Sequence, residues 1–176
     1  SSGLTPARGI IHLHSPWSHD ACDGDPLPDG SPDPECLAAL RQGLCATRMN
    51  YAYLTDHPDH AAWQDWGALF HAQEDDRWAV NSDGQAIGIW YACGDSQPGH
   101  EVLIMPGIED ELMPLGHEAL VAETSKERHA IFNQSDAETV QANRDAGALV
   151  FLAHTEGREL KATRELVQSG VQGIEI

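Results

Sequence analysis

Basic side chains are scarce in this chain of 176 residues, which has 10 Lys and Arg against 28 Asp and Glu and a formal net charge of −18. A surface with such an excess of acid repels a polyanion, so we expect no nucleic-acid partner. We also find no apolar run of membrane-spanning length and no signal peptide in the sequence. Neither Gly-x-Ser-x-Gly nor Cys-x-x-Cys occurs, so no serine or cysteine nucleophile is predicted.

Histidines are present in a pattern that points to metal binding. The segment 10–15 reads IIHLHS and places His12 and His14 two residues apart. Side chains alternate between the two faces of a strand, so both imidazoles would point the same way while Ile11 and Leu13 face the opposite layer. This arrangement offers two ligands to one metal ion. The alternative is a half-buried strand whose histidines are satisfied by hydrogen bonds.

Three further apolar segments end in a histidine or a carboxylate. Residues 51–57 end in Asp-His57, residues 102–109 end in Glu109, and residues 148–154 end in His154. In a parallel α/β barrel the carboxyl ends of the strands converge on one face, so residues far apart in the sequence meet there. We therefore expect these side chains to gather with the His12 pair.

Five short motifs, in order along the chain, carry a resemblance to a known family. They are HLHSPWSHD at 12–20, LTDHP at 54–58, PGIE at 106–109, GH at 116–117 and LAHTEGR at 152–158. With these motifs the chain resembles the polymerase and histidinol phosphatase (PHP) superfamily of metal-dependent phosphoesterases. The resemblance implies an α/β fold, a distorted (β/α)7 TIM-like barrel. It also implies two or three divalent metal ions (zinc, manganese or iron) and a small phosphorylated substrate.

The resemblance also implies a ligand set. The matching metal ligands are His12, His14, His57, Glu109, His117 and His154. One more ligand follows the His-x-His pair by five or six residues in the family, and here either His19 or Asp20 fills that place. The sequence leaves this choice open.

Catalytic roles follow from the same residues. Glu109 matches the family's bridging carboxylate, and a carboxylate between two ions helps them to activate a shared water and to hold phosphoryl oxygens. We therefore expect Glu109 and His57 to take part in catalysis. Arg158, four residues after His154, is the best candidate to bind the phosphate, with a surface charge as its alternative role.

One family feature is missing. The closing Asp-x-His does not occur before the chain stops at residue 176, so the third ion is in doubt. At this length the chain is also short for a barrel, which takes about 200 residues or more. We expect a single PHP domain over 1–176 that either is a fragment of a longer barrel or completes its site in another way. The alternative functions are a hydrolase of a non-phosphate ester or carbamate, and a non-catalytic metal-binding module. The oligomeric state is not predicted.

The remaining chain predicts alternating helices and strands. Helices are expected at 34–48 behind an Asp33 N-cap, at 137–146 before Gly147, and at 160–169 before Gly170, with a last strand at 171–176. This order favours parallel strands. Residues 61–99 break the pattern with a short helix near 63–70 and a strand at 87–92, and we interpret them as an insertion over the site. Histidines outside the motifs are assigned to the surface or to loops: His60, His71, His100 and His129.

The four cysteines leave two interpretations open. Cys36 and Cys45 lie nine residues apart on one predicted helix, about 13 Å at 1.5 Å per residue, which is too far for a disulfide. Cys22 could reach either of them. Disulfides are expected if the protein is exported, and the sequence slightly favours export because Ser1-Ser-Gly, just before the first strand, is compatible with a processed leader or a trimmed tag. Otherwise the thiols are free and buried.

Overall fold

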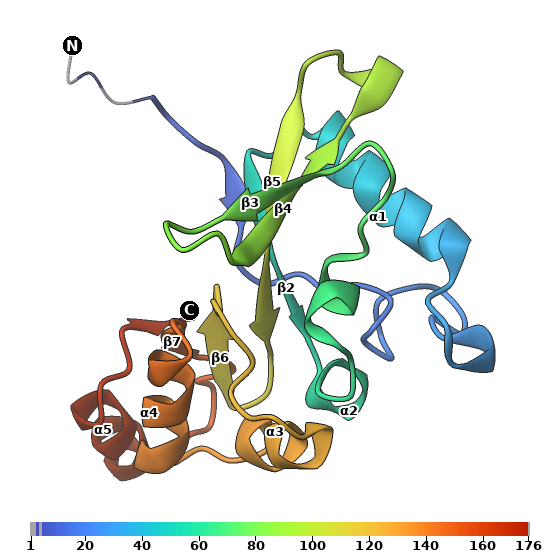
Figure 1. Ribbon diagram of the computed structural model, residues 1–176. Helices are drawn as coiled ribbons and strands as arrows, with labels where there is room; N and C mark the ends of the chain where they lie inside the picture. The colour runs from blue at the N-terminus through green and yellow to red at the C-terminus, as the bar shows by residue number, and fades with distance from the viewer. Residues whose placement is uncertain (1–2, 4, 176) are drawn as a thin grey trace.

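The computed structural model describes residues 3 and 5–175. The first two residues of the Ser1-Ser-Gly segment and Ile176 of the expected last strand lie outside this part of the chain. The described residues form one continuous sheet with helices packed against it (Figure 1). Its strands are β1 (Gly9–Ile10), β2 (Tyr51–Asp56), β3 (Arg77–Val80), β4 (Ala86–Ala92), β5 (Glu101–Ile108), β6 (Leu112–Leu115), β7 (Leu149–Leu152) and β8 (Gly173–Ile174). The α-helices are α1 (Pro34–Ala46), α2 (Pro58–Ala61), α3 (Ser125–Phe132), α4 (Ala137–Asp145) and α5 (Leu160–Gln168).

The sheet is an open, curled half-barrel, so the expected closed (β/α)7 TIM-like barrel is wrong. The strand order is β1-β2-β5-β6-β7-β8, with β4 paired to β5 and β3 to β4. Strands β1, β2 and β5 are mutually parallel, as are β7 and β8, whereas β6 is antiparallel to both β5 and β7. Within the described residues the edge strands β1 and β8 do not pair with each other, and the barrel is not closed.

The antiparallel strand β6 explains this difference. Only residues 109–111 separate β5 from β6, and such a short connection can join antiparallel strands but not parallel ones, which need a crossover of a dozen or more residues. Strand β6 reads Leu-Met-Pro-Leu, and its proline and its short length conceal it from a search for strand patterns. Even so, β2, β5 and β7 run in the same direction, so their carboxyl ends still lie at one end of the sheet.

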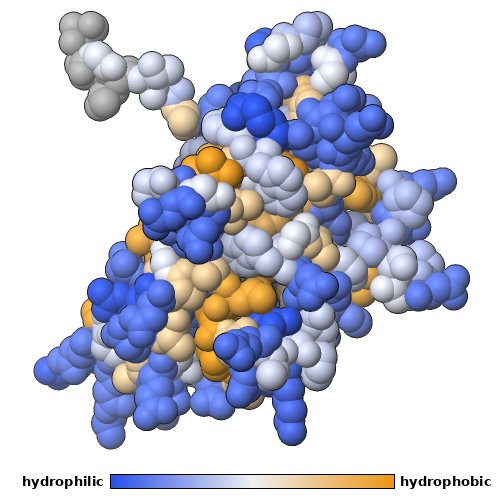
Figure 2. Space-filling model, viewed as in Figure 1, coloured by the Kyte–Doolittle hydropathy of each residue, from blue (hydrophilic) through white to orange (hydrophobic). Residues whose placement is uncertain are grey.

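Two hydrophobic layers hold the sheet. On one side α1 packs against the central strands through Leu44, Leu54, Ile89 and Ile104, all buried. At the other end α4 and α5 cover β6 and β7 (Figure 1), where Leu112, Val150 and Leu152 contact Val140 and Leu166. Hydrophilic residues cover most of the face drawn in Figure 2, with hydrophobic groups between them. None of the described helices combines the length and apolar character needed to cross a membrane.

The helix boundaries agree closely with the sequence pattern. The Asp33 side chain accepts a hydrogen bond of 2.7 Å from the Cys36 N–H at the start of α1. Gly147 and Gly170 follow α4 and α5 with φ of +90° and +111°, the left-handed region that glycine adopts easily at a helix C-terminus. These three helices therefore form where they are expected, and they fix the positions of the strands that follow them.

The first strand is shorter than expected. Only residues 9–10 pair as β1, although the chain stays beside β2 beyond that point: Thr55 N–H donates to the Leu13 carbonyl (2.8 Å), and Leu13 N–H donates to Thr55 Oγ1 (3.1 Å). This pairing keeps His12 and His14 on the same side. The expected consequence of the strand, two imidazoles that point together, therefore holds without the full strand.

Residues 61–99 contribute two separate pieces. A 3-10 helix at Trp66–Phe70 and strand β4 appear where a short helix and a strand are expected. Strand β3 joins β4 in an antiparallel hairpin that pairs with the first half of β5, as Ile89 with Ile104 and Ala92 with Glu101. The hairpin therefore widens the sheet at the end of β5 away from Glu109, and residues 62–76 lie nearer to the site.

All four cysteines are in disulfides. Cys22 pairs with Cys36, one of the two partners that the sequence allows, and Cys45 pairs with Cys93 of the inserted segment. The Cys22–Cys36 bond ties the loop after β1 to the first turn of α1. The alternative of free, buried thiols is therefore wrong.

Candidate metal centre

Glu109 lies directly after β5 and is surrounded by imidazoles. Its side chain is almost fully buried, with the residue 1% exposed. Carboxylate atom Oε2 is 2.9 Å from His57 Nδ1, 3.4 Å from His14 Nε2 and 4.0 Å from His12 Nε2. The other oxygen, Oε1, forms a hydrogen bond with His154 Nε2. The structure thus brings four of the predicted histidine ligands together around the fifth predicted ligand, the Glu109 carboxylate.

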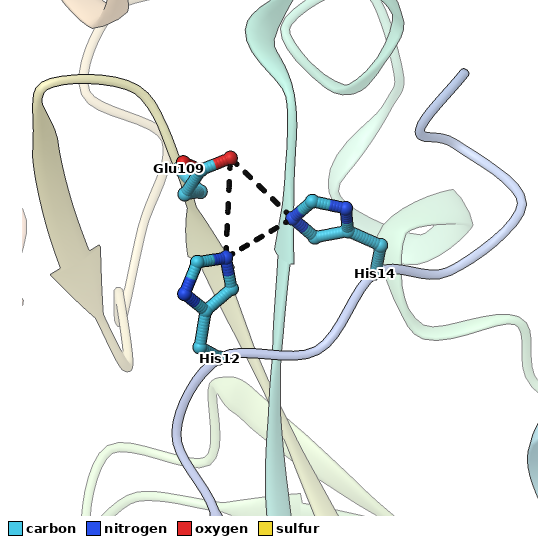
Figure 3. Close-up of side chains that lie close together, drawn as sticks. All are labelled: His12, His14 and Glu109. Carbon is cyan, nitrogen blue, oxygen red and sulfur yellow. Dashed lines mark hydrogen bonds and ion pairs between the residues drawn. The ribbon is translucent and has the colours of Figure 1, made fainter. Parts of the chain in front are cut away.

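Within this group, His12 Nε2, His14 Nε2 and Glu109 Oε2 face one another. Figure 3 shows Glu109 pointing between His12 and His14. The two Nε2 atoms are 3.3 Å apart. His12 Nδ1 lies 2.7 Å from Glu175 Oε1, and His14 Nδ1 lies 2.8 Å from Asp20 Oδ1. With each Nδ1–H donating to a carboxylate, each ring in its neutral form would present a lone pair at Nε2.

The spacing of these atoms fits a metal ion. Glu109 Oε2 is buried and makes no hydrogen bond, because His57 Nδ1, 2.9 Å away, pairs with the Glu109 backbone carbonyl instead. Such an oxygen is costly to bury unless a cation or a proton compensates. Nitrogen and oxygen ligands about 2.0–2.2 Å from a tetrahedral zinc ion lie about 3.3–3.6 Å from one another. The His12–His14 separation of 3.3 Å and the His14–Glu109 separation of 3.4 Å match this spacing, and the His12–Glu109 separation of 4.0 Å is slightly longer.

The pKa values reflect the same arrangement. Burial alone would lower the pKa of His14, but the carboxylates of Glu109 and Asp20 outweigh it and raise the pKa to about 8. Burial likewise acts to raise the pKa of Glu109, yet the imidazoles of His14, His57, His154 and His12 reverse the effect and lower it. Without a metal, a proton is thus held at the place where a cation would sit, and metal and proton compete for these ligands.

A second group of possible ligands adjoins the first. It consists of His14, Asp20 and His57, with Asp20 Oδ2 3.5 Å from His57 Nε2. The ring of His19 instead stacks on that of His57 at 4.9 Å between centroids. Of the two candidates left open by the sequence, Asp20 belongs to the group and His19 does not. Because a neutral imidazole has one lone pair, His14 serves only one of the two groups.

Outer contacts orient the ligands as they do in many metal sites. Ligating histidines almost always donate their second N–H to a carboxylate or carbonyl, which fixes the ring. The His12–Glu175 contact has this form, and His57 Nδ1 lies 3.0 Å from the Glu109 backbone carbonyl. Glu175 was not among the predicted site residues. The signal for it was the Gly-Ile-Glu ending at 173–175, which repeats the Gly-Ile-Glu ending at Glu109.

Glutamine at position 175 is expected to weaken metal binding without removing it. The amide keeps the shape of the side chain but loses the charge that holds the His12 Nδ1–H, and loss of such an outer partner typically costs about 10–100-fold in metal affinity. The measurement is zinc affinity by competition with a chromophoric chelator. Glu138→Gln, at an exposed position in α4, is the control and should bind zinc as the wild type does. Equal affinity in Glu175→Gln would contradict the outer-contact role.

His117 is not brought to the cluster, contrary to the ligand role that the resemblance implies. It is 3% exposed, its Nε2 lies 2.8 Å from Asn143 Oδ1, and its ring meets Phe132 edge-on. Burial lowers the pKa of His117 to about 4. Strand β6 carries it away from the end of β5 because the two strands are antiparallel. His117 is therefore a neutral, structural histidine in this fold.

This neutral state predicts a pH dependence of stability. The unfolded chain takes up a proton on His117 near pH 6.5 while the folded chain does so only near pH 4, so stability rises with pH across this window. The contribution is about 3 kcal/mol at 1.36 kcal/mol per pKa unit. Urea unfolding between pH 4 and pH 7 measures it, and the slope should be smaller in His117→Gln. An equal slope in both proteins would exclude His117 as the cause.

Arg158 lies near the cluster but is held by a neighbouring acid. Its Nη2 donates to the Glu111 carbonyl at 2.8 Å, and its Nη1 is 3.3 Å from Glu111 Oε2. Its Nε is buried without a hydrogen-bond partner. A guanidinium has five N–H donors, so this anchoring leaves donors available to an anion. The structure thus places Arg158 close to the proposed ligands without assigning it a task.

A cavity of about 850 Å³ opens at the cluster, with His57, Glu109, His154 and Arg158 in its lining. The imidazole of His154 is largely exposed at this cavity, with 64% of the side chain accessible. Carboxylates provide most of the other polar lining groups: Asp110, Glu111, Asp136, Glu156, Glu159 and Glu165. Burial, together with the charges of Glu111 and Glu109, raises the pKa of Asp110. The cavity is therefore strongly acidic apart from Arg158 and any bound cation.

No family model, curated protein or solved structure matches this chain. The likeness to the PHP superfamily therefore rests on the five short motifs alone.

Proposed function

We propose that the protein is a metal-dependent hydrolase that acts on a small phosphate ester with two divalent cations. The observation that carries this proposal is the buried, unsatisfied Oε2 of Glu109, which faces imidazole nitrogens of His12 and His14 at a spacing suited to a metal ion. Imidazole and carboxylate ligands suit zinc, manganese or iron. The resemblance of the motifs to PHP phosphoesterases supports the choice of reaction.

The ligands divide between two positions. His12, His14 and Glu109 would hold one cation, and Asp20 with His57 would hold the second. When bound, divalent cations of this kind acidify water and neutralise the charge of phosphoryl oxygens. Oε2 of Glu109 lies close to His57 Nδ1 as well as to His14 Nε2, so Glu109 adjoins residues proposed for both positions. No third group of close ligands occurs among residues 3 and 5–175, so the proposal is limited to two ions.

The other residues of the site orient the metal ligands and bind the substrate. Glu175 and Asp20 hold the Nδ1–H groups of His12 and His14, so that both Nε2 lone pairs point at Glu109. Arg158, anchored by Glu111 and lining the cavity, would bind a phosphoryl oxygen through an N–H donor that Glu111 leaves free. Hydrolysis needs no serine or cysteine nucleophile in this scheme, since water is the attacking group.

The charge of the cavity restricts the substrate. Six carboxylates besides Glu109 line it, and Arg158 is the one Lys or Arg among its described lining residues. Substrates with several negative charges are repelled there, and the net charge of −18 acts in the same direction for nucleic acids. The substrate class that we propose is a phosphate ester whose remaining part is neutral or cationic.

The experiment is an activity panel on protein stripped of metal and then reloaded with manganese or zinc. Phosphate monoesters, phosphate diesters and carboxyl esters are compared under each condition. The proposal predicts hydrolysis of a phosphate ester that depends on added metal. Turnover of carboxyl esters alone would favour the alternative hydrolase, and tight metal binding without any turnover would favour a non-catalytic metal-binding module.

A further inference from the structure

A buried chain of hydrogen bonds lies behind the metal centre and joins three segments of the protein. Ser15 Oγ donates to Asp56 Oδ2 at 2.7 Å, and Ser15 N–H donates to Asp56 Oδ1 at 2.6 Å. His71 Nε2 lies 2.7 Å from the same Ser15 Oγ. The exposed fractions of Ser15, Asp56 and His71 are 0%, 2% and 8%, so solvent does not replace these bonds. His71 thus lies in a turn after the 3-10 helix, as one of the two expected placements has it, but it is buried and not on the surface.

The direction of each hydrogen bond follows from the donors available. An ionised carboxylate only accepts, so the single hydroxyl proton of Ser15 goes to Asp56. The oxygen of Ser15 then accepts from two groups, the Trp17 N–H at 3.2 Å and His71 Nε2–H. His71 must accordingly carry its proton on Nε2. Loss of this donor would leave a buried lone pair of Ser15 without its partner, a cost of about 1–3 kcal/mol.

His71 is itself held firmly on its other sides. Its ring stacks on Trp17, with centroids 5.7 Å apart and planes at 22°. Its backbone has a φ of +46°, and its carbonyl accepts from Arg41 Nη1 at 3.5 Å. The Arg41 guanidinium is fixed in turn by two bonds to Asp76, of 2.9 and 2.6 Å. The contacts with Trp17 and Arg41 therefore fix the position of His71, with its Nε2–H directed at Ser15 Oγ.

The hydrogen-bond chain affects the positions of the metal ligands through the residues next to them in the sequence. Ser15 follows His14, and Asp56 precedes His57. The Ser15–Asp56 pair therefore sets the separation of the two backbone segments that carry these imidazoles. We propose that His71 is a positioning residue that locks this pair and thereby keeps the metal ligands at binding distance. This inference rests on the proposed metal site and extends it to a residue outside every recognised motif.

The test compares three replacements by the affinity of the metal-stripped protein for zinc, measured with a chromophoric chelator. His71→Leu keeps bulk but removes the donor, and it should weaken binding by about 10–100-fold, as loss of an outer partner does. His71→Gln places an amide N–H where Nε2 lies and should restore affinity close to that of the wild type. His100→Leu is the control, because its Nε2 bonds the Met49 carbonyl at 2.9 Å next to the start of β5, far along the strand from Glu109.

The outcomes separate this inference from the proposed function. If wild-type protein binds no zinc, the metal site itself is wrong. If the wild type binds and His71→Leu binds equally well, only the positioning role is overturned. If His71→Leu does not fold, the test uses His71→Asn instead. The asparagine side chain is shorter than glutamine, so its amide cannot reach Ser15 Oγ. Weak binding by Asn beside normal binding by Gln then supports the role, and equal binding contradicts it.

Discussion

Replacement of Glu109 by glutamine is expected to remove metal binding at the His12–His14 group and the hydrolysis that depends on it. The amide keeps the size of the side chain but turns an acceptor into a donor beside imidazole lone pairs, and it removes the charge that a cation would meet. Turnover should fall by more than about 100-fold, which exceeds the usual effect of an outer-shell partner. Steady-state kinetics and zinc titration measure the two losses.

The control for this variant is Glu165→Gln. Glu165 lines the same cavity but is exposed, and it has only a distant pair with Lys161 at 3.9 Å. Both variants make the same change of charge within one cavity. A loss confined to Glu109→Gln therefore reports coordination, whereas equal losses in both variants would show that the general charge of the cavity, and not Glu109, determines activity.

Bound zinc or manganese is expected to raise the melting temperature strongly. A ligand that binds only the folded protein stabilises it by about 4 kcal/mol at 1,000 times its Kd. For a chain of 150–250 residues each kcal/mol shifts Tm by about 2–4 °C, so a shift of roughly 8–16 °C is expected. Calorimetry of metal-stripped protein, with and without metal, measures it.

The variant Glu109→Gln is the control in the thermal experiment. Because it lacks the central ligand, its melting temperature should respond little to the same metal concentration. A similar rise in both proteins would mean that the metal binds elsewhere, for example at exposed carboxylates. No rise in the wild type at millimolar zinc would argue against the centre altogether.

The convergence of the ligands could be predicted from the sequence because it depends on a simple rule. Apolar segments that end in His57, Glu109 and His154 become the parallel strands β2, β5 and β7, and side chains that follow parallel strands gather at one end of a sheet. The helices before or after these strands were also predictable from their N-cap and glycine signals. The rule holds in an open sheet as well as in a closed barrel.

The closure of the sheet could not be predicted in the same way. Whether β1 meets a last strand depends on strand number and tilt, and the short antiparallel strand β6 interrupts the expected alternation. The same strand places His117 away from the cluster, although the resemblance implies a ligand at this position. The structure thus brings the motif residues at the strand ends together and places the one after β6 elsewhere.

Contacts between segments far apart in the sequence could not be predicted from the sequence either. Glu175 meets His12 across 163 positions and His71 meets Ser15 across 56, separations for which no local pattern exists. The choice between His19 and Asp20 also depended on loop geometry, which the Cys22–Cys36 bond helps to set. Local patterns indicate which residues can bind a metal, and the fold decides which of them meet.

The most direct test of the account is the location of metal in crystals grown with zinc, measured by anomalous scattering at the zinc edge. The account predicts a strong peak bounded by His12 Nε2, His14 Nε2 and Glu109 Oε2. Crystals with ample zinc but no peak among these three atoms would contradict it.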